Sequence, residues 1–326
     1  MQLKAQKYLD WVLVLVMNFM WATQVPVIKL IGERLGPVAI AFVPMILSTL
    51  MFLPALWREV RKKKTRRPWC WGDARHFLVA GLFGYFFLQF AYTLGSQRTL
   101  AANAGIITLT IPVFVAVAGS FLLQEKLNAA RVAGFVLALM GVLLTSISDL
   151  KGSDFHHSSY VAGNIIFLMA CAGCGFYNAY CKLLVTKGYS ELEILVYTSV
   201  VGSLASIPLF VWVEPFDFWA FARADRIAVW GILELSFIVY GVSMLLFFYV
   251  LKRMDVTQAI LGNYLLPFFI ALLAVVLLKE SITLPMIFGG ALILLSTLMV
   301  SVYEGDILAW GQQKRVAWKT WRRQQE

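Results

Sequence analysis

Long apolar segments separated by short polar stretches run along most of the chain. A helix that crosses the hydrocarbon core of a membrane needs about 20 mostly apolar residues, and ten segments are long enough. The pattern therefore predicts an all-α integral membrane protein with ten transmembrane helices. We expect these helices over residues 11–31, 37–57, 73–95, 102–123, 129–148, 160–184, 191–212, 227–251, 257–278 and 284–303.

The composition agrees with a membrane protein. Of the 326 residues, 60% are hydrophobic and 14% are charged, whereas a soluble domain is nearer half apolar and a quarter charged. This excludes a disordered chain, a soluble nucleic-acid-binding domain and an ordinary soluble enzyme. The net charge of +10 then indicates cytoplasmic loops and contact with anionic lipids rather than with nucleic acid. We expect a multi-pass protein of the cell membrane whose partner is the lipid bilayer.

The positions of Lys and Arg predict the orientation. With the N-terminus inside, the inner segments hold 21 of these residues and the outer segments hold 7, so both termini are expected to be cytoplasmic. The basic segment from Arg58 to Arg67 and the amphipathic tail over residues 305–326 are expected to bind anionic lipids on that side. For the tail, a partner-binding helix is an open alternative.

An internal repeat divides the chain into two halves, residues 1–150 and 158–304, with five predicted spans each. An odd number of spans gives the halves opposite orientations, and two inverted halves are the architecture of many secondary transporters. A shift of 155 residues aligns Arg98 with Arg253, Ala104 with Ala259, Pro112 with Pro267, Glu125 with Glu280, and Gly134 with Gly289.

Two segments, residues 94–144 and 251–295, resemble the EamA repeat of the drug/metabolite transporter superfamily. The shared pattern is a small-residue start, a Pro in mid-span, a Glu at the end of the span and a Gly in the next span. Trp21 also stands where the family often has a Trp. The resemblance covers about residues 10–303 and implies transport of small solutes. The pattern is carried here by Ala102, Ala104, Pro112, Glu125 and Gly134, and again by Ala259, Pro267, Glu280 and Gly289.

One departure from the family pattern limits what can be carried over. Many members have an Arg early in the second span, where this chain has Phe42, Val43 and Pro44. A substrate contact ascribed to that Arg therefore does not apply here.

The repeated prolines and glycines are structural or hinge candidates. Pro112 and Pro267 each remove one backbone hydrogen bond and bend a span. In lipid the freed carbonyl must find a partner or face a cavity, so we expect helices that bend around a central cavity. A kink that only improves packing is the alternative, and Gly134 and Gly289 are assigned to the same structural group.

Glu125 and Glu280 lie at the ends of two spans, beside short polar turns. One interpretation is that each carboxylate accepts backbone N–H groups and ties one span to the next. The other is a gating ion pair, for instance between Glu280 and Lys279 or Arg226.

Glu234 is a carboxylate well inside a predicted span, roughly 10 Å from its start at 1.5 Å per residue. Charged groups at such depth are costly and usually functional. Two roles fit Glu234: it carries a proton that drives transport, or it binds a cationic group of the substrate. A wet outer vestibule around the side chain is the alternative.

Polar and aromatic side chains mark several other spans and, with Glu234, form the predicted substrate site. Unpaired amides are expensive in hydrocarbon, so these groups should face one another or a cavity, and hydrogen bonds between helices are the alternative to solute contact. Spans 2, 5, 7 and 10 have fewer such groups and are expected to form the outer wall. The set is Asn18, Trp21, Gln24, Tyr85, Gln89, Tyr92, Tyr177, Asn178, Tyr240, Asn263 and Tyr264.

Such a cavity would be aromatic, lined by amides and weakly charged, which suits neutral, zwitterionic or amphipathic molecules. The sequence thus predicts a secondary transporter that exports small organic metabolites such as amino acids or drugs by alternating access. Neither a cofactor nor a metal is expected. Protons are a candidate coupling ion, through Glu234, and the sequence does not fix the coupling ion. A transporter-like sensor or complex subunit is the second hypothesis. A lipid-modifying enzyme is the third, and the three scattered histidines argue against it.

Overall fold

The computed structural model describes residues 2–62, 71–122, 129–147, 155–214, 225–251 and 263–301. Three predictions fall outside these ranges: the role of Glu125, the lipid-binding tail over residues 305–326, and most of the basic segment that begins at Arg58.

The first half of the chain folds into helices over all five of its predicted spans. The first span is interrupted at Thr23, and the third contains a π-helical segment, η1. The elements are α1 (Gln2–Ala22), α2 (Gln24–Gly32), α3 (Pro37–Lys62), α4 (Trp71–Val79), η1 (Ala80–Phe86), α5 (Phe87–Arg98), α6 (Ala101–Thr108), α7 (Ile111–Leu122) and α8 (Ala129–Ile147).

The second half repeats this pattern. Its third span contains a second π-helical segment, η3, and its fourth is described from a short 3-10 turn, η4, onward. The elements are α9 (Phe155–Thr186), α10 (Glu191–Trp212), α12 (Arg226–Leu233), η3 (Glu234–Val242), α13 (Ser243–Leu251), η4 (Asn263–Leu265), α15 (Leu266–Leu278) and α16 (Leu284–Ser301).

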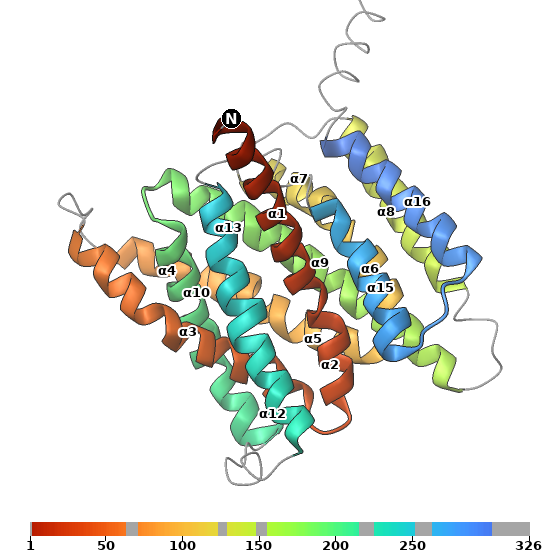
Figure 1. Cartoon of the computed structure of the whole chain (residues 1–326), viewed down its shortest axis with the longest axis horizontal. Helices are drawn as coiled ribbons and strands as arrows, with labels where there is room; N and C mark the ends of the chain where they lie inside the picture. Colours follow the sequence, from red (N-terminus) through yellow and green to blue (C-terminus); the bar gives the residue numbers. More distant parts are fainter. Residues whose placement is uncertain are drawn as a thin grey trace, which may run out of the picture.

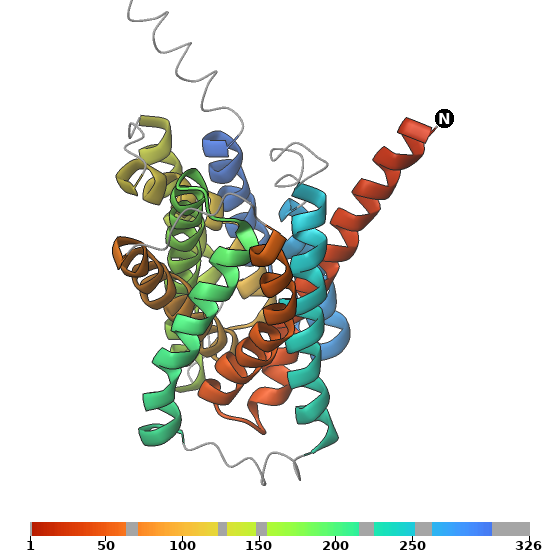
Figure 2. The same ribbon diagram turned by 90° about the vertical axis from the view of Figure 1, so that its left-hand side faces the viewer.

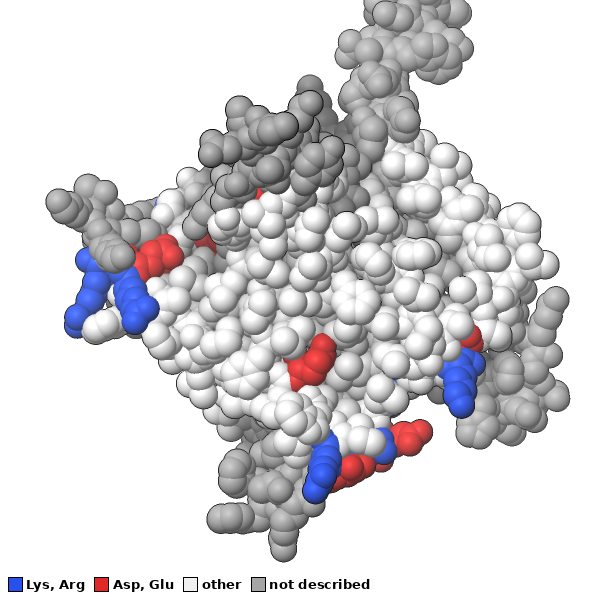
Figure 3. Space-filling view, viewed as in Figure 1, with Lys and Arg blue, Asp and Glu red and all other residues white. Residues whose placement is uncertain are grey.

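Six of the described helical segments are long and apolar enough to cross a membrane, and α6 with α7 makes a seventh if this pair, bent by 41°, is one span. Shorter apolar helices cover residues 132–145, 266–278 and 284–299. In Figure 3, charged side chains gather toward the edges of the visible face, and the surface between them is mostly uncharged, although acidic atoms also appear within it. This distribution suits a molecule with a broad apolar belt.

Contacts between helices are repeated when the two halves are exchanged. Equivalent helices pack on each other in three pairs: α3 with α10, α6 with α15, and α8 with α16. The contact of α5 with α9 is matched by that of α13 with α1, and the contact of η1 with α10 is matched by that of η3 with α3. Figure 1 shows α8 and α16 side by side at one edge of the bundle, and Figure 2 shows the start of α1 extending away from it.

The two π-helical segments occupy equivalent places in the repeat. A shift of 155 residues places η1 over residues 235–241, within η3. π-helical turns are rare and often occur at functional sites. Their recurrence at the same position in both halves indicates that the third span of each half has the same local design.

The expected outer wall is only partly correct. α8 and α16 form a peripheral pair, as expected (Figure 1). In contrast, α3 and α10 pack on each other and on η1 and η3, and Phe42 of α3 is fully buried against Phe86 and Phe90, with ring centroids 5.0 and 6.1 Å apart. Spans 2 and 7 therefore each bury one face against other helices, largely through apolar side chains. Their other faces are exposed, as at Leu50 and Leu204.

Candidate functional site

Three of the predicted residues form a hydrogen-bonded chain between the two halves. The Gln24 amide donates to the Tyr240 hydroxyl at 2.8 Å, and this hydroxyl donates to Oε1 of Gln89, also at 2.8 Å. Gln24 lies in α2, Gln89 in α5 and Tyr240 in η3. Gln89 and Tyr240 are buried, so this chain satisfies polar groups that would otherwise be costly in the interior.

Aromatic side chains extend this polar chain toward the second half. Tyr85 and Tyr177 lie with ring centroids 5.3 Å apart, and the Tyr177 hydroxyl is 3.0 Å from that of Thr198. The ring of Tyr92 packs on Phe167 at 4.7 Å. The predicted aromatic and amide-bearing set is therefore brought together in large part. In this conformation its polar groups bind one another.

Other members of the predicted set take no part in these hydrogen bonds. Asn178 is exposed and donates to the Cys174 carbonyl in its own helix, at 2.8 Å. Asn18 is fully buried and donates to Val14 O. Trp21 packs on Phe247, with centroids 5.5 Å apart.

Near the start of α15, the Tyr264 hydroxyl is buried without a hydrogen-bond partner among the described residues. The side chain of Asn263, the remaining member of the predicted set, is outside the description.

Glu234 begins η3 and contacts the interruption between α1 and α2. Its Oε1 accepts a hydrogen bond from Thr23, whose hydroxyl also lies 2.7 Å from the Met20 carbonyl. Thr23 has one proton for these two acceptors, so both contacts are satisfied at once when Glu234 is protonated and donates to Thr23. Sequence reasoning missed Thr23, because a threonine three residues before a proline, here Pro26, is too common to be a signal.

A cluster at the far end of α2 joins the halves through Glu280. Its carboxylate accepts hydrogen bonds from the backbone N–H groups of Ala101 and Ala102, at 2.9 and 3.0 Å. Lys29 Nζ lies 3.3 Å from Glu280 Oε1 and also donates to the Thr99 carbonyl. A carboxylate at the N-terminus of α6 is favoured because the free N–H groups of the first helical turn point toward it.

The predicted roles of Glu280 are therefore corrected in two ways. The carboxylate accepts backbone N–H groups, but they belong to α6 in the other half rather than to the next span. Its ion-pair partner is Lys29, not Lys279 or Arg226; Lys279 instead ends α15 in a left-handed conformation, with φ of 55°. The signal for Lys29 was available, because it is a lysine within a predicted apolar span.

A second carboxylate is used in the same way and was missed. Glu214, after α10, accepts hydrogen bonds from the N–H groups of Val38 and Ala39 at 2.9 and 3.0 Å, at the start of α3. Gly36 makes room for it, since a Cβ there would lie 2.2 Å from the Glu214 carboxylate carbon. At both Glu280 and Glu214, a carboxylate of the second half therefore accepts N–H groups at the start of a helix of the first half.

The repeated prolines lie at helix starts rather than in mid-helix. Pro112 is the second residue of α7, just after the 41° bend that separates α6 from α7. Pro267 is the second residue of α15 and follows the 3-10 turn η4. The bend expected at Pro112 is present, and the proline stands where its missing N–H would be unpaired anyway.

The repeated glycines lie where α8 crosses α16. A Cβ at Gly289 would be 2.6 Å from the carbonyl oxygen of Gly141, so a side chain there would separate the helices. Ser296 of α16 donates to the Gly134 carbonyl at 2.5 Å. These contacts assign Gly134 and Gly289 to helix packing.

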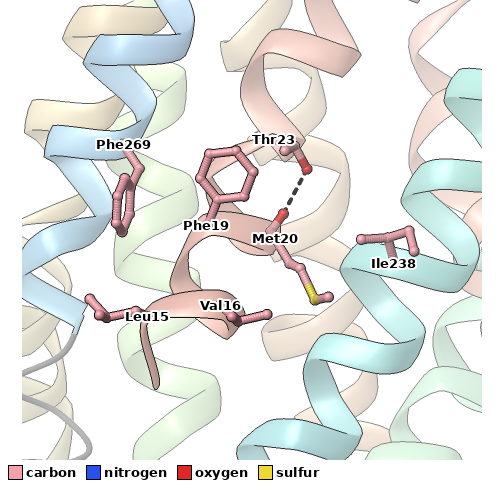
Figure 4. A pocket seen from close by; sticks show the side chains of 7 residues that line it. All are labelled: Leu15, Val16, Phe19, Met20, Thr23, Ile238 and Phe269. Atoms are coloured by element: carbon pink, nitrogen blue, oxygen red, sulfur yellow. Dashed lines mark hydrogen bonds between the residues drawn. The ribbon is translucent and has the colours of Figure 1, made fainter. Parts of the chain in front are cut away.

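A cavity of about 480 Å³ lies beside the candidate site rather than within the cluster of Gln24, Gln89 and Tyr240. It is formed by α1, η3 and α15 (Figure 4). Thr23 lines the cavity and is hydrogen-bonded to Glu234. Among the described residues, no group of three or more His, Cys, Asp or Glu side chains is arranged to hold a metal ion.

The fold and these contacts between repeats define a multi-pass helical membrane protein built from two similar halves. The model of the EamA-like transporter family matches the chain twice, over residues 11–147 and 161–302. The chain belongs to the EamA-like transporter family.

Curated relatives of this chain are transporters. The probable terminal-alkyne amino-acid exporter of Streptantibioticus cattleyicolor is 23% identical over 292 residues, which are 89% of this chain and 92% of that protein. The S-adenosylmethionine uptake transporter of Rickettsia felis is 24% identical over 234 residues, 71% of this chain and 70% of that protein. These names point to a transporter rather than an enzyme.

A solved crystal structure shares the fold. With 18% sequence identity and a TM-score of 0.58, it covers 89% of this chain and 96% of its own.

Proposed function

We propose that this chain is a secondary transporter that moves small organic solutes by alternating access between two inverted five-helix halves. The observation that carries the proposal is the polar chain from Gln24 through Tyr240 to Gln89, which runs across the boundary between the halves. When the halves move apart, these amides and the phenol lose their partners. A solute with complementary hydrogen-bonding groups would then replace them.

Contacts at one end of α2 support a state that is closed on that side. Lys29 pairs with Glu280 at 3.3 Å, and Arg34 pairs with Asp225 at 2.6 Å. Each pair joins a first-half residue to a second-half residue. With the N-terminus in the cytoplasm this end faces outward, so the conformation described here is closed to the outside.

Proton coupling through Glu234 completes the mechanism. The hydrogen bonds of Thr23 to Met20 and Glu234 are both satisfied when Glu234 carries a proton. Release of that proton leaves a charged carboxylate inside a helix that is otherwise mostly apolar, which is costly. Protonation is therefore linked to the packing of the α1–α2 break against η3.

The solutes proposed are amino acids and other small metabolites or drugs, moved outward across the plasma membrane. The name of the Streptantibioticus relative supports export, and that of the Rickettsia relative shows that uptake also occurs among relatives. Anionic lipids are proposed at the end of α3, where the exposed Arg61 guanidinium lies 3.6 Å from the centroid of the Trp57 ring. Such an aromatic and basic pair suits the interface of a membrane.

Flux measurements on the purified protein in liposomes test the proposal. A panel of radiolabelled amino acids should include at least one solute that moves faster than in protein-free liposomes and shows saturation. Tyr240→Phe removes only the central hydroxyl of the polar chain and should slow that flux about tenfold. Tyr249→Phe, on the exposed side of α13, is the matched control and should leave it unchanged. Stabilisation by solutes without any flux would instead identify a sensor.

A further inference from the structure

A lateral groove runs along α1 and ends at the α1–α2 break. It has a volume of about 480 Å³, within the range of pockets that bind drug-sized molecules. Its lining residues extend from Leu15 in α1 to Thr23, just after α1, which corresponds to about 12 Å along a helix. All lining side chains except Thr23 are apolar (Figure 4). They are Leu15, Val16, Phe19, Met20, Ile238 and Phe269.

A carboxylate with an unused oxygen lies next to Thr23, the polar residue at the end of this groove. Thr23 lines the groove and bonds Oε1 of Glu234. Oε2 of Glu234 is buried and has no hydrogen-bond partner among the described residues. Ile238 follows Glu234 by four residues in η3, which places both side chains on one side of that segment.

No described cation neutralises Glu234. The ion pairs in the described part of the chain join Lys29 to Glu280 and Arg34 to Asp225. Once the proton proposed above is released, a buried carboxylate oxygen without a partner is costly, and a positive group placed against it would remove that cost. Thr23 stands between the groove and Glu234. A positive group that reaches the carboxylate past Thr23 would leave the apolar wall of about 12 Å to be covered by an apolar body attached to it.

We propose that the groove binds an amphipathic organic cation, whose charged head contacts Glu234 beside Thr23 and whose apolar body lies along α1. The inference rests on the proposed transport function, for which it names a class of solute. Because the groove is open at the side of α1, such a cation enters from the bilayer. A neutral lipid chain in the same groove would have no group to pair with Oε2 of Glu234.

Equilibrium dialysis with radiolabelled n-octyltrimethylammonium tests this assignment. The protein is held in nanodiscs of zwitterionic lipid, and empty nanodiscs of the same lipid give the partitioning to be subtracted. We expect saturable binding with one site per chain. An excess of octanoate or 1-octanol, which share the chain but not the positive charge, should not displace the probe.

Two variants address the head and the body of the ligand separately. Glu234→Gln keeps the shape of the side chain and should raise the Kd about tenfold or more through loss of the charge interaction. Ile238→Trp fills the groove and should have an effect of similar size. The matched controls are Glu33→Gln, at an exposed carboxylate, and Ile287→Trp, on the exposed side of α16; both should bind as the wild type does.

Three results would overturn the proposal: no saturable binding above empty nanodiscs, binding unchanged in Glu234→Gln, or equal displacement by octanol. Binding that depends on Glu234 but not on Ile238 would place the cation elsewhere and also refute the groove. If Glu234→Gln fails to fold, Ile238→Trp and Phe269→Trp decide the question. Flux of amino acids without cation binding refutes only this inference, whereas cation binding without any flux refutes the transport function.

Discussion

Replacement of Lys29 and Glu280 by glutamine, singly and together, measures how strongly their ion pair holds the two halves together. The two charged atoms are 3.3 Å apart, and the side chains are 18% and 8% exposed. At an effective dielectric constant of about 20, the attraction is about 5 kcal/mol. Desolvation of both groups offsets much of it, so a double-mutant cycle should give a coupling energy of about 1–2 kcal/mol.

The single variants should differ in size. Glu280→Gln should lower the free energy of unfolding by about 2–4 kcal/mol, because it also weakens the charged hydrogen bonds from the N–H groups of Ala101 and Ala102. Lys29→Gln should cost only about 1–2 kcal/mol, since Glu280 keeps both N–H donors. Reversible unfolding in mixed detergent micelles provides these values. A coupling energy below about 0.5 kcal/mol would refute the assigned ion pair.

The same coupling should control access to the N-terminal end of α6. Ala102 is 1% exposed, so a cysteine placed there reports on opening through its reaction with a membrane-impermeant maleimide. A coupling of 1–2 kcal/mol corresponds to about 5-fold to 30-fold faster labelling in Glu280→Gln. The parent with its native cysteines gives the background, and Glu33→Gln is the control. An unchanged rate in a destabilised Glu280→Gln protein would show that the contact stabilises the fold without closing a pathway.

Further predictions concern coupling, packing and a surface ion pair. Glu234→Gln should abolish the pH dependence of flux in liposomes with an imposed pH gradient; persistence of that dependence excludes Glu234 as the proton carrier. Gly289→Ala should destabilise by about 1–3 kcal/mol in the unfolding assay because its Cβ would lie 2.6 Å from a carbonyl oxygen of α8, whereas Gly290→Ala, with contacts no closer than 3.4 Å, should be neutral or stabilising. The hydrogen bond from Arg34 holds the pKa of the Asp225 carboxyl below its usual value. Its contribution to stability is therefore present above the pKa of a free Asp and is lost as the pH falls through the lowered pKa, so the Tm difference between wild type and Asp225→Asn should vanish in acid.

The positions of the helices were predictable from the sequence because a membrane demands long uninterrupted apolar segments. The side chains that face one another were harder to predict. An α-helix has a period of 3.6 residues, but η1 and η3 close their turns with i→i+5 bonds and thereby shift the faces of every residue beyond them. Gln24, Gln89 and Tyr240 were chosen for their chemistry, and only the structure shows that the Tyr240 hydroxyl joins the two amides.

The contacts of Glu280 and Glu214 with helix starts show a second limit on prediction from sequence. Glu280 was identified by the repeat, but its partners Lys29 and Ala101 are more than 170 residues away in the chain. Glu214 lay next to a span end and gave no pattern of its own. Contacts of this kind depend on the packing of the halves, which a single sequence does not display, whereas the bend near Pro112 follows from local backbone chemistry.

The crossing of α8 and α16 has a mechanical consequence. At Gly141 and Gly289 the two backbones touch without side chains between them, and interlocking side chains are what normally oppose a change in crossing angle. Neighbouring side chains such as Thr145 and Ile293 border this contact closely, so they oppose sliding of one helix along the other. Rotation of one helix against the other at the contact point is comparatively free. Since one helix belongs to each half, the point where these glycines meet is a natural pivot.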